Sequence, residues 1–285
     1  MPNSRSELLA GRNHIMVGAF ETRGSEDCAI AISAGGAAKV YPHTEPNEDA
    51  ALFTHGPGGS LVAVADGHHG ARGSLTALEG LARQTHWTAM ESGLDSPTAW
   101  EQNLLEVLVE GNAAILSLAE RIGAPPSPTT LAVAIVRPGE DLIVHGVIGD
   151  SHLFLAHETA VIDLGWRSLR GGNKTFFLGS RRETQNSLAS RAAIGCRTLA
   201  GARAVVLATD GLSEEGIGVA DPARAVTNAV QHAEDAGDDE TAARRIAQEI
   251  LDTALAAQRE NESGDNIAVA VARVMPRAPS QSESA

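Results

Sequence analysis

The chain has 285 residues, enough for one large domain or two small ones. Its 36 acidic residues outnumber its 22 lysines and arginines, which argues against a general nucleic-acid binder because such proteins neutralise phosphates with basic side chains. Its two cysteines cannot form a disulfide framework, no run of about 18 apolar residues is present, and the amino-terminal segment lacks the apolar core of a signal peptide. We therefore expect a cytoplasmic protein that does not cross a membrane.

The first part of the chain alternates short apolar stretches with turn residues, a pattern typical of β-strands. Strands are expected at residues 14–20, 28–33, 50–53 and 61–65. A turn is predicted at 22–26, and a glycine-rich loop at 54–60. The wholly apolar run 61–65 is typical of a buried strand, and it leads directly into Asp66-Gly67-His68.

Two helices and a second group of strands are predicted next. Leu75, Leu78 and Leu81 recur at helical spacing, which predicts a helix through about residue 90. Ser96-Pro97 has the N-cap and first-turn proline of a second helix. This helix should end at 123–128. Strands are then expected at 130–136, 142–148, 153–156 and 160–164, and their close spacing predicts a meander.

The rest of the chain begins with segment 165–195, which lacks periodicity and is predicted to be a functional loop or lid. After it we expect a strand at 204–208, helices at 222–233 and 241–257, and a strand at 267–274. The Pro/Ser-rich end, 276–285, is expected to be a disordered tail after a single domain spanning 1–275. This order of elements predicts an α+β sandwich, in which two mostly antiparallel sheets pack face to face with helices outside.

Four acidic clusters lie at the edges of predicted strands. They are Asn47-Glu48-Asp49, Asp66-Gly67-His68, Asp210-Gly211 and Asp265-Asn266. Strand ends can aim carboxylates from distant segments at one point, which a hard divalent cation requires. The pattern indicates a two-metal hydrolase. Taken singly each cluster also fits a turn, because Asp-Gly is among the commonest turn dipeptides.

Six short motifs in chain order resemble the metal-dependent serine/threonine protein phosphatases of type 2C. They are Asn47-Glu48-Asp49-Ala50, Val64-Ala65-Asp66-Gly67-His68-His69-Gly70, Thr129-Thr130-Leu131, Gly149-Asp150-Ser151-His152, Thr209-Asp210-Gly211-Leu212 and Gly264-Asp265-Asn266-Ile267. The resemblance implies a four-layer αββα sandwich with two Mg²⁺ or Mn²⁺ ions at one end. It also implies a phosphatase that acts on phosphorylated proteins, and we expect a monomer.

The resemblance further implies a set of metal ligands. Asp66 would bridge the two metals. The Gly67 carbonyl would bind one of them, and Asp210 and Asp265 would bind the other. The remaining ligands, which would hold metal directly or through water, are Glu48 and Asp49.

Two further positions carry implied roles. His68 matches the proposed general acid, which suits a histidine because the serine alkoxide is a poor leaving group and needs a proton. Asp150 matches an acidic position that family members use for a weaker third metal. Asp150-Ser151 fits a hairpin turn equally well.

The sequence departs from the family pattern where substrate phosphate is bound. An arginine usually stands four residues before the first motif's glutamate, whereas this chain has Thr44 there with His43 beside it. Threonine cannot make the two parallel charged hydrogen bonds of a guanidinium, and His152 stands where another arginine is common. The candidate replacements in segment 165–195 are Arg167, Arg170, Arg181, Arg182 and Arg191.

Three interpretations of these departures stay open. The chain could be a protein phosphatase with a substitute cation, a phosphatase for a small phosphoester, or a regulatory domain that binds phosphoproteins with little turnover.

Overall fold

The computed structural model describes residues 5–40, 43–88, 93–165, 175–181 and 183–274, without the side chains of 84–88. Twelve strands form two six-stranded sheets, ordered β1-β4-β5-β6-β7-β10 and β2-β3-β12-β11-β8-β9. The first sheet contains β1 (Arg5–Ala10), β4 (Ala50–Gly56), β5 (Gly59–Ala65), β6 (Leu131–Arg137), β7 (Leu142–Ile148) and β10 (Ala193–Thr198). The second contains β2 (Phe20–Gly24), β3 (Cys28–Ser33), β12 (Ile267–Arg273), β11 (Ala202–Ala208), β8 (His152–His157) and β9 (Val161–Asp163).

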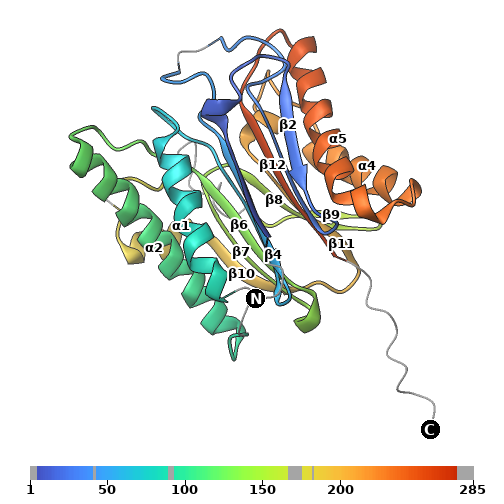
Figure 1. Ribbon diagram of the computed structural model, residues 1–285, viewed down its shortest axis with the longest axis horizontal. Helices are drawn as coiled ribbons and strands as arrows, with labels where there is room; N and C mark the ends of the chain where they lie inside the picture. Colours follow the sequence, from blue (N-terminus) through green and yellow to red (C-terminus); the bar gives the residue numbers. More distant parts are fainter. Residues whose placement is uncertain (1–4, 41–42, 89–92, 166–174, 182, 275–285) are drawn as a thin grey trace.

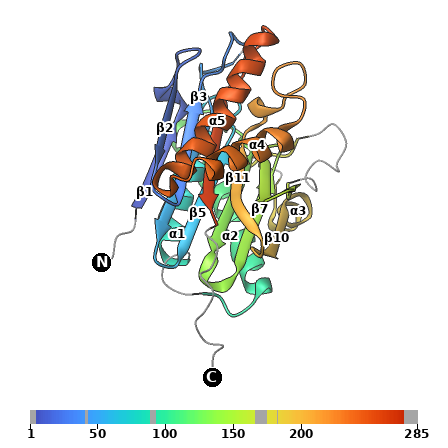
Figure 2. The same ribbon diagram turned by 90° about the vertical axis from the view of Figure 1, so that its right-hand side faces the viewer.

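Five α-helices accompany the sheets: α1 (Arg72–Thr88), α2 (Pro97–Ile122), α3 (Gln185–Arg191), α4 (Pro222–Asp235) and α5 (Asp239–Glu260). Figures 1 and 2 show the sheets face to face, with α1 and α2 outside the first sheet and α4 and α5 outside the second. All neighbouring strands pair antiparallel. The predicted α+β sandwich is confirmed.

The strand β5 shows how the sequence builds three apolar layers. Its side chains alternate between faces, so Val62 and Val64 join the core between the sheets while Leu61 and Ala63 join the core under α1 and α2. Both faces are therefore buried, which explains the unbroken apolar run. A third apolar layer lies between the second sheet and α4 and α5.

The helix α2 begins and ends where its capping residues predict. The Ser96 hydroxyl accepts a hydrogen bond from the Ala99 amide, and Gly123 adopts the left-handed conformation at the other end. Its buried side is formed by Trp100, Leu104, Leu108, Asn112, Ile115 and Ala119. None of the helices in the described part of the chain is long and apolar enough to span a bilayer.

Three predictions for the first part of the chain were wrong. The predicted strand at 14–20 is largely irregular, with Ile15, Met16 and Val17 exposed; strands instead occupy Arg5–Ala10 and Phe20–Gly24, so the predicted turn at 22–26 overlaps β2. The strand was predicted at 14–20 from apolar character alone. In the structure the segment that pairs with β4 is Arg5–Ala10, which lies earlier in the chain. The predicted loop at 54–60 is a tight hairpin, with Gly56 paired to Gly59.

The predicted meander at 130–164 was also wrong. The strands β6 and β7 pair in one sheet, whereas β8 and β9 pair in the other. The chain crosses between the sheets at 149–151, where Gly149 has a φ of 104°, a conformation that favours glycine. This crossing places Asp150 at one end of the sandwich.

The predicted long loop at 165–195 contains regular structure in its described part. The helix α3 begins with Thr184 as its N-cap, and β10 adds an edge strand to the first sheet. The end of the chain predicted to be a disordered tail, 276–285, lies outside the described residues, as do 166–174 within the predicted loop.

Candidate active site

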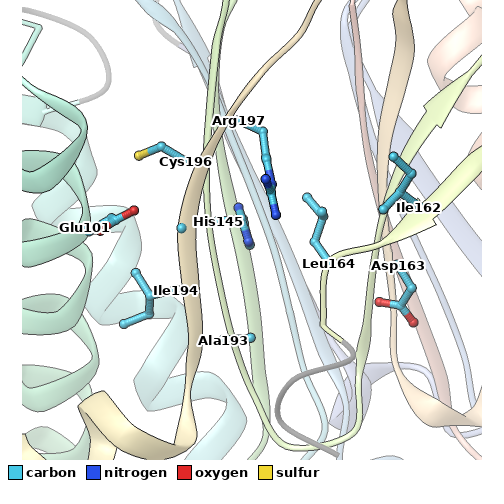
Figure 3. Close-up of a pocket in the computed structure, with 10 residues that line it drawn as sticks. Glu101, His145, Ile162, Asp163, Leu164, Ala193, Ile194, Cys196 and Arg197 are labelled. Carbon is cyan, nitrogen blue, oxygen red and sulfur yellow. The ribbon is translucent and has the colours of Figure 1, made fainter.

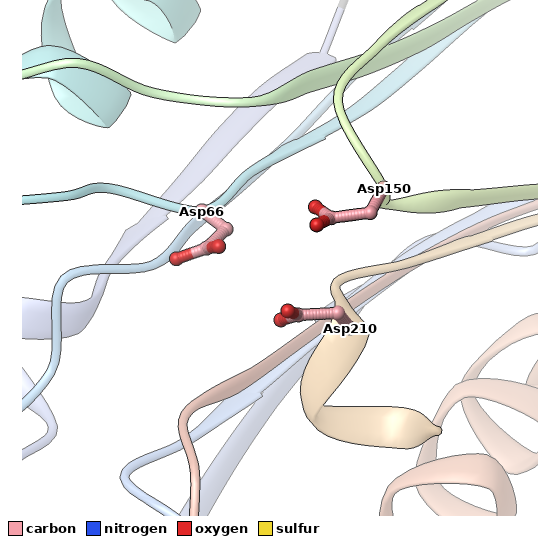
Figure 4. Close-up of side chains that lie close together, drawn as sticks. All are labelled: Asp66, Asp150 and Asp210. Carbon is pink, nitrogen blue, oxygen red and sulfur yellow. The ribbon is translucent and has the colours of Figure 1, made fainter. Parts of the chain in front are cut away.

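Three aspartates converge at one end of the sandwich (Figure 4). Asp66 follows β5, Asp150 lies at the crossing between the sheets, and Asp210 follows β11. One carboxylate oxygen from each lies within 4.8 Å of the others. A second group under the same limit consists of Asp210, Glu214 and Asp265. Because Asp210 belongs to both groups, the site offers oxygen ligands for two neighbouring cations.

The Thr129-Thr130 motif holds two of these loops in place. The Thr129 hydroxyl donates to the Asp66 carbonyl at 2.8 Å, and the Asp66 amide donates to the Thr130 hydroxyl at 3.0 Å. The Thr130 hydroxyl also lies 2.8 Å from that of Ser151, which follows Asp150. These buried hydroxyls therefore fix the spacing between the Asp66 and Asp150 loops.

The Asp210 and Asp265 loops touch through a glycine. A Cβ atom on Gly211 would lie 1.8 Å from the Asn266 carbonyl oxygen, so no larger residue fits between them. The fully buried Gln258 joins the two loops, donating to the Gly211 carbonyl at 2.9 Å and accepting from the Asp265 amide at 3.3 Å. The common Asp-Gly turn is therefore a point of close backbone contact in this chain.

Glu48 and Asp49 are buried beside the cluster but belong to neither carboxylate group. One Glu48 oxygen accepts three backbone hydrogen bonds, from Thr44, Glu45 and Gly70, at 2.9–3.0 Å. Asp49 accepts a hydrogen bond of 2.7 Å from the Thr209 hydroxyl. In this arrangement Glu48 braces the loop around Gly70, and its other oxygen is the one that remains for a ligand.

The aspartates carry charge that the fold leaves poorly compensated. Burial, followed by repulsion from neighbouring carboxylates, raises the pKa values of Asp66 and Asp210 well above their ordinary range. The same causes raise the pKa of Asp49 to about 7. One oxygen of Asp150 is buried without a hydrogen-bond partner. Such an oxygen-only, electron-rich cluster fits hard divalent cations.

Lys39 brings positive charge to this cluster and was not predicted. Its ammonium group lies 3.1 Å from an Asp265 oxygen, 2.5 Å from the Asn266 side-chain oxygen and 3.0 Å from His43 Nδ1. Its side chain is only 11% exposed. Burial, then the nearby Lys39 charge, lowers the pKa of His43, so Lys39 is the cation of this pair. The one available signal was that Lys39 is the only basic residue between 34 and 49 apart from histidine.

His68 lies at the open side of the cluster. Its Nδ1 is 3.7 Å from an Asp66 oxygen, and its ring packs against Phe177 with centroids 4.5 Å apart. The side chain is 42% exposed, so it can reach a bound substrate. Burial is the main cause that lowers its pKa, and the charge of Asp150 opposes this effect. His69 follows in a left-handed conformation, with φ of 63°.

His152 takes part in a hydrogen-bonded chain. Its Nδ1 lies 2.9 Å from Asp163, and its Nε2 lies 2.6 Å from the Ser213 hydroxyl. This chain ties the edge strand β9 to the turn that carries Asp210. His152 thus supports the Asp210 turn.

The candidate arginines of segment 165–195 are only partly described. Arg191 forms an ion pair with Glu183 and lies over the Phe176 ring at 4.5 Å. It is therefore already engaged in the structure. The candidates outside the described residues are Arg167, Arg170 and Arg182.

Three solved structures illustrate the fold to which this chain is similar. The catalytic domain of the serine/threonine protein phosphatase PstP, in complex with two manganese ions, is 19% identical, with 90% of this chain and 99% of that chain covered and a TM-score of 0.60. A serine-threonine phosphatase 2C from Toxoplasma gondii is 15% identical, with 96% and 99% covered and a TM-score of 0.62. PppA from Pseudomonas aeruginosa is 17% identical, with 90% and 99% covered and a TM-score of 0.57.

Sequence comparison supplies the family. No curated protein matches the chain. A family model described as protein phosphatase 2C matches residues 39–256, from Lys39 to just short of the Asp265-Asn266 motif. The match covers most of the chain and includes five of the six motifs. The chain belongs to the protein phosphatase 2C family, the metal-dependent serine/threonine protein phosphatases.

Proposed function

We propose that this chain removes phosphate from phosphoserine and phosphothreonine in proteins, at the carboxylate cluster around Asp66 and Asp210. The observation that carries the proposal is the convergence of partly or fully buried carboxylates, among which Asp66 and Asp210 have raised pKa values, with no described counter-charge except Lys39. Two Mg²⁺ or Mn²⁺ ions are the proposed cofactors, as in the similar PstP structure with its two manganese ions.

The two carboxylate groups define where the cations would bind. One would be held by Asp66 with Asp150 and Asp210, and the other by Asp210 with Glu214 and Asp265. Asp66 as the bridging ligand, the Gly67 carbonyl and the third site at Asp150 stay predictions. When bound, the cations would neutralise phosphoryl oxygens and supply an activated water for attack.

The chain's own residues complete the chemistry around that centre. His68, whose Nδ1 lies 3.7 Å from an Asp66 oxygen, would hold a proton for the leaving oxygen, which a serine or threonine leaving group requires. Asn266 fixes the ligand loops by accepting from the Glu48 amide at 3.0 Å and donating to the Pro46 carbonyl at 2.9 Å. Thr209 fixes Asp49 in the same way. These contacts of Thr209 and Asn266 would hold the ligand loops in the same geometry when a cation replaces the protons on the carboxyl groups.

Cation binding should release protons and tighten as pH rises. A carboxyl group with a raised pKa holds its proton in the metal-free protein, so a cation must displace that proton. Asp49, with a pKa of about 7, places part of this change near neutrality. Calorimetric titration with Mn²⁺ in buffers of different ionisation enthalpy should show proton release at about pH 6 and tighter binding at about pH 8. Equal affinity and no buffer dependence across this range would contradict the assignment of the cluster as the cation site.

We also propose that Lys39 takes the role of the phosphate-binding arginine, which this chain lacks because position 44 is a threonine. Lys39 reaches the cluster from the loop after β3, and its contact with Asp265 would be exchanged for substrate phosphate once a cation holds that carboxylate. A lysine ammonium binds phosphate as a compact point charge, without the two-pronged geometry of a guanidinium.

Substitution of Lys39 by methionine is expected to raise KM for phosphopeptides about tenfold with little change in kcat. This pattern is expected when the lost contact binds the substrate and the transition state equally well. Lys39→Arg keeps the charge and is the matched control, so it should retain most of the affinity. Thr44→Arg should then lower KM less in the parent protein than in Lys39→Met. If Lys39→Met leaves KM unchanged while Thr44→Arg lowers it, Lys39 does not bind the substrate phosphate.

The substrate class is tested by comparing phosphoserine peptides with small phosphoesters such as sugar phosphates and nucleoside monophosphates. The protein phosphatase assignment predicts Mn²⁺-dependent turnover of the peptides with the higher kcat/KM. Turnover confined to small phosphoesters would favour the second of the three open interpretations. Binding of phosphopeptides without turnover would favour the third.

A further inference from the structure

A cavity of about 370 Å³ opens at the edge of the sandwich around the edge strand β10, with β9 on one side of that strand and α2 on the other (Figure 3). One wall comes from Ile162, Asp163 and Leu164, and the opposite wall from His145, Gly195 and Arg197. This volume is within the range of sites that hold small organic ligands. The cavity is separate from the carboxylate groups, none of whose members lines it.

The sequence creates this space by leaving the layer between the sheets incomplete. The strand β9 has only three residues, and β10 presents the small residues Ala193 and Gly195. Gly195 pairs directly with His145 of β7, and a Cβ on Gly195 would lie 3.0 Å from the His145 ring. A larger residue here would therefore narrow the cavity.

The cavity carries an unengaged positive charge. Figure 3 shows the Arg197 guanidinium directed between His145 and Leu164. The Arg197 side chain is exposed at this edge and makes no hydrogen bond or ion pair with any described residue. The Asp163 carboxylate of the cavity already has partners, since one oxygen contacts His152 and the other accepts a hydrogen bond from the Gly165 amide. Glu101 lies beyond β10, on the α2 side.

We propose that this cavity binds a small organic monocarboxylate with a short apolar body. The Arg197 guanidinium would hold the carboxylate through two parallel hydrogen bonds, and Leu164 and Ile162 would contact the apolar part. The Asp163 carboxylate at the cavity disfavours a dianion such as a phosphate ester more strongly than it disfavours a monoanion. The ligand is thus distinguished from the enzyme's phosphorylated substrates.

Ligand binding at this edge should be linked to the metal centre. Asp163 is at once a wall of the cavity and the partner of His152, and His152 holds Ser213 just beyond Asp210. A ligand that shifts Asp163 would, through His152 and Ser213, also shift the turn that carries Asp210. By reciprocity, a change in cation affinity caused by the ligand implies an equal change in ligand affinity caused by the cation.

The binding test uses the full chain without metal, so it does not depend on the proposed function. Benzoate serves as the probe, with benzamide as its neutral isostere and inorganic phosphate as the multivalent anion, each titrated by ligand-observed NMR. Benzoate should bind at least tenfold more tightly than benzamide or phosphate. Arg197→Ala should weaken benzoate binding about tenfold or more, which corresponds to about 1.4 kcal/mol.

Two further variants keep the test decisive. Gly195→Val leaves Arg197 in place but fills the cavity, so it should also remove benzoate binding. Arg121→Ala, at the exposed end of α2 about 30 Å along the helix from Glu101, should change nothing. Absence of benzoate binding, equal binding of benzamide, or unaltered binding in both cavity variants would overturn the proposed site.

The linkage is tested by measuring Mn²⁺ affinity with and without saturating benzoate. We expect the Kd for Mn²⁺ to change at least twofold in the parent protein and not in Arg197→Ala. An identical Kd under both conditions in the parent protein would overturn the linkage.

Discussion

Replacing Asp66 or Asp210 by asparagine is expected to reduce phosphopeptide hydrolysis by roughly 10³-fold or more, because each change removes a charged ligand from the cation cluster and metal-ion catalysis contributes several kcal/mol. EDTA should abolish activity in the parent protein, and added Mn²⁺ should restore it. Asp252→Asn, on the exposed side of α5, is the matched surface control and should retain full activity. Activity of Asp66→Asn within tenfold of the parent value would remove Asp66 from the cation site.

The same substitutions should stabilise the metal-free protein. This result would distinguish carboxylates that bind cations from carboxylates that stabilise the fold. Raised folded-state pKa values mean that these carboxyl groups bind protons more tightly in the folded than in the unfolded chain. The metal-free protein therefore loses stability as pH rises from the ordinary aspartate pKa of about 4 through about 7, where Asp49 titrates. Asparagine carries no such charge.

In EDTA at about pH 8, Asp66→Asn and Asp210→Asn should thus melt at a higher temperature than the parent protein, by several degrees per kcal/mol recovered. Excess Mn²⁺ should reverse the order, because binding to the folded state stabilises it. A lower melting temperature for both variants in EDTA would show that the carboxylates support the fold without metal.

Replacing His68 by glutamine is expected to slow hydrolysis of a phosphoserine peptide by roughly 10²-fold or more, the usual contribution of a positioned acid. The loss should be smaller for para-nitrophenyl phosphate, since nitrophenolate leaves with little help from a proton. The structure supports this role because the His68 side chain is 42% exposed while its Nδ1 lies 3.7 Å from an Asp66 oxygen.

The control for His68 is its neighbour. His69 has a left-handed backbone, which asparagine tolerates well, so His69→Asn preserves the turn while removing the second imidazole. This variant should retain activity on both substrates. Equal losses on the peptide and on para-nitrophenyl phosphate in His68→Gln would exclude the general-acid role.

Local patterns predicted most of the regular structure. The run at 61–65 is buried on both faces, and the Ser96-Pro97 cap starts α2 where it was expected. The errors arose where partners distant in sequence decide the outcome. The segment 153–164 pairs in the second sheet because β8 meets β11, whose paired residues lie about fifty positions later, and no local spacing contains that information. Likewise β10 is an edge strand whose small residues give no clear strand pattern.

The convergence of the acidic residues could be predicted further than the fold around them, because they lie in short motifs at strand ends. The structure brings Asp66, Asp150 and Asp210 together as a group and places Asp265 in a second group. It also shows that one Glu48 oxygen accepts hydrogen bonds from three backbone amides. No sequence motif predicted these hydrogen bonds. Lys39 and Glu214 were missed because each enters the site through a loop whose path the sequence does not specify.

The most direct test of the central claim is phosphate release from a phosphoserine peptide by the metal-stripped protein, titrated with Mn²⁺. We predict no turnover without added metal and saturable turnover with it. Loss of that turnover in Asp66→Asn and Asp210→Asn, with both variants folded, would assign it to the carboxylate cluster. Phosphate release that persists in excess EDTA, or that is unaffected by both substitutions, would contradict the account.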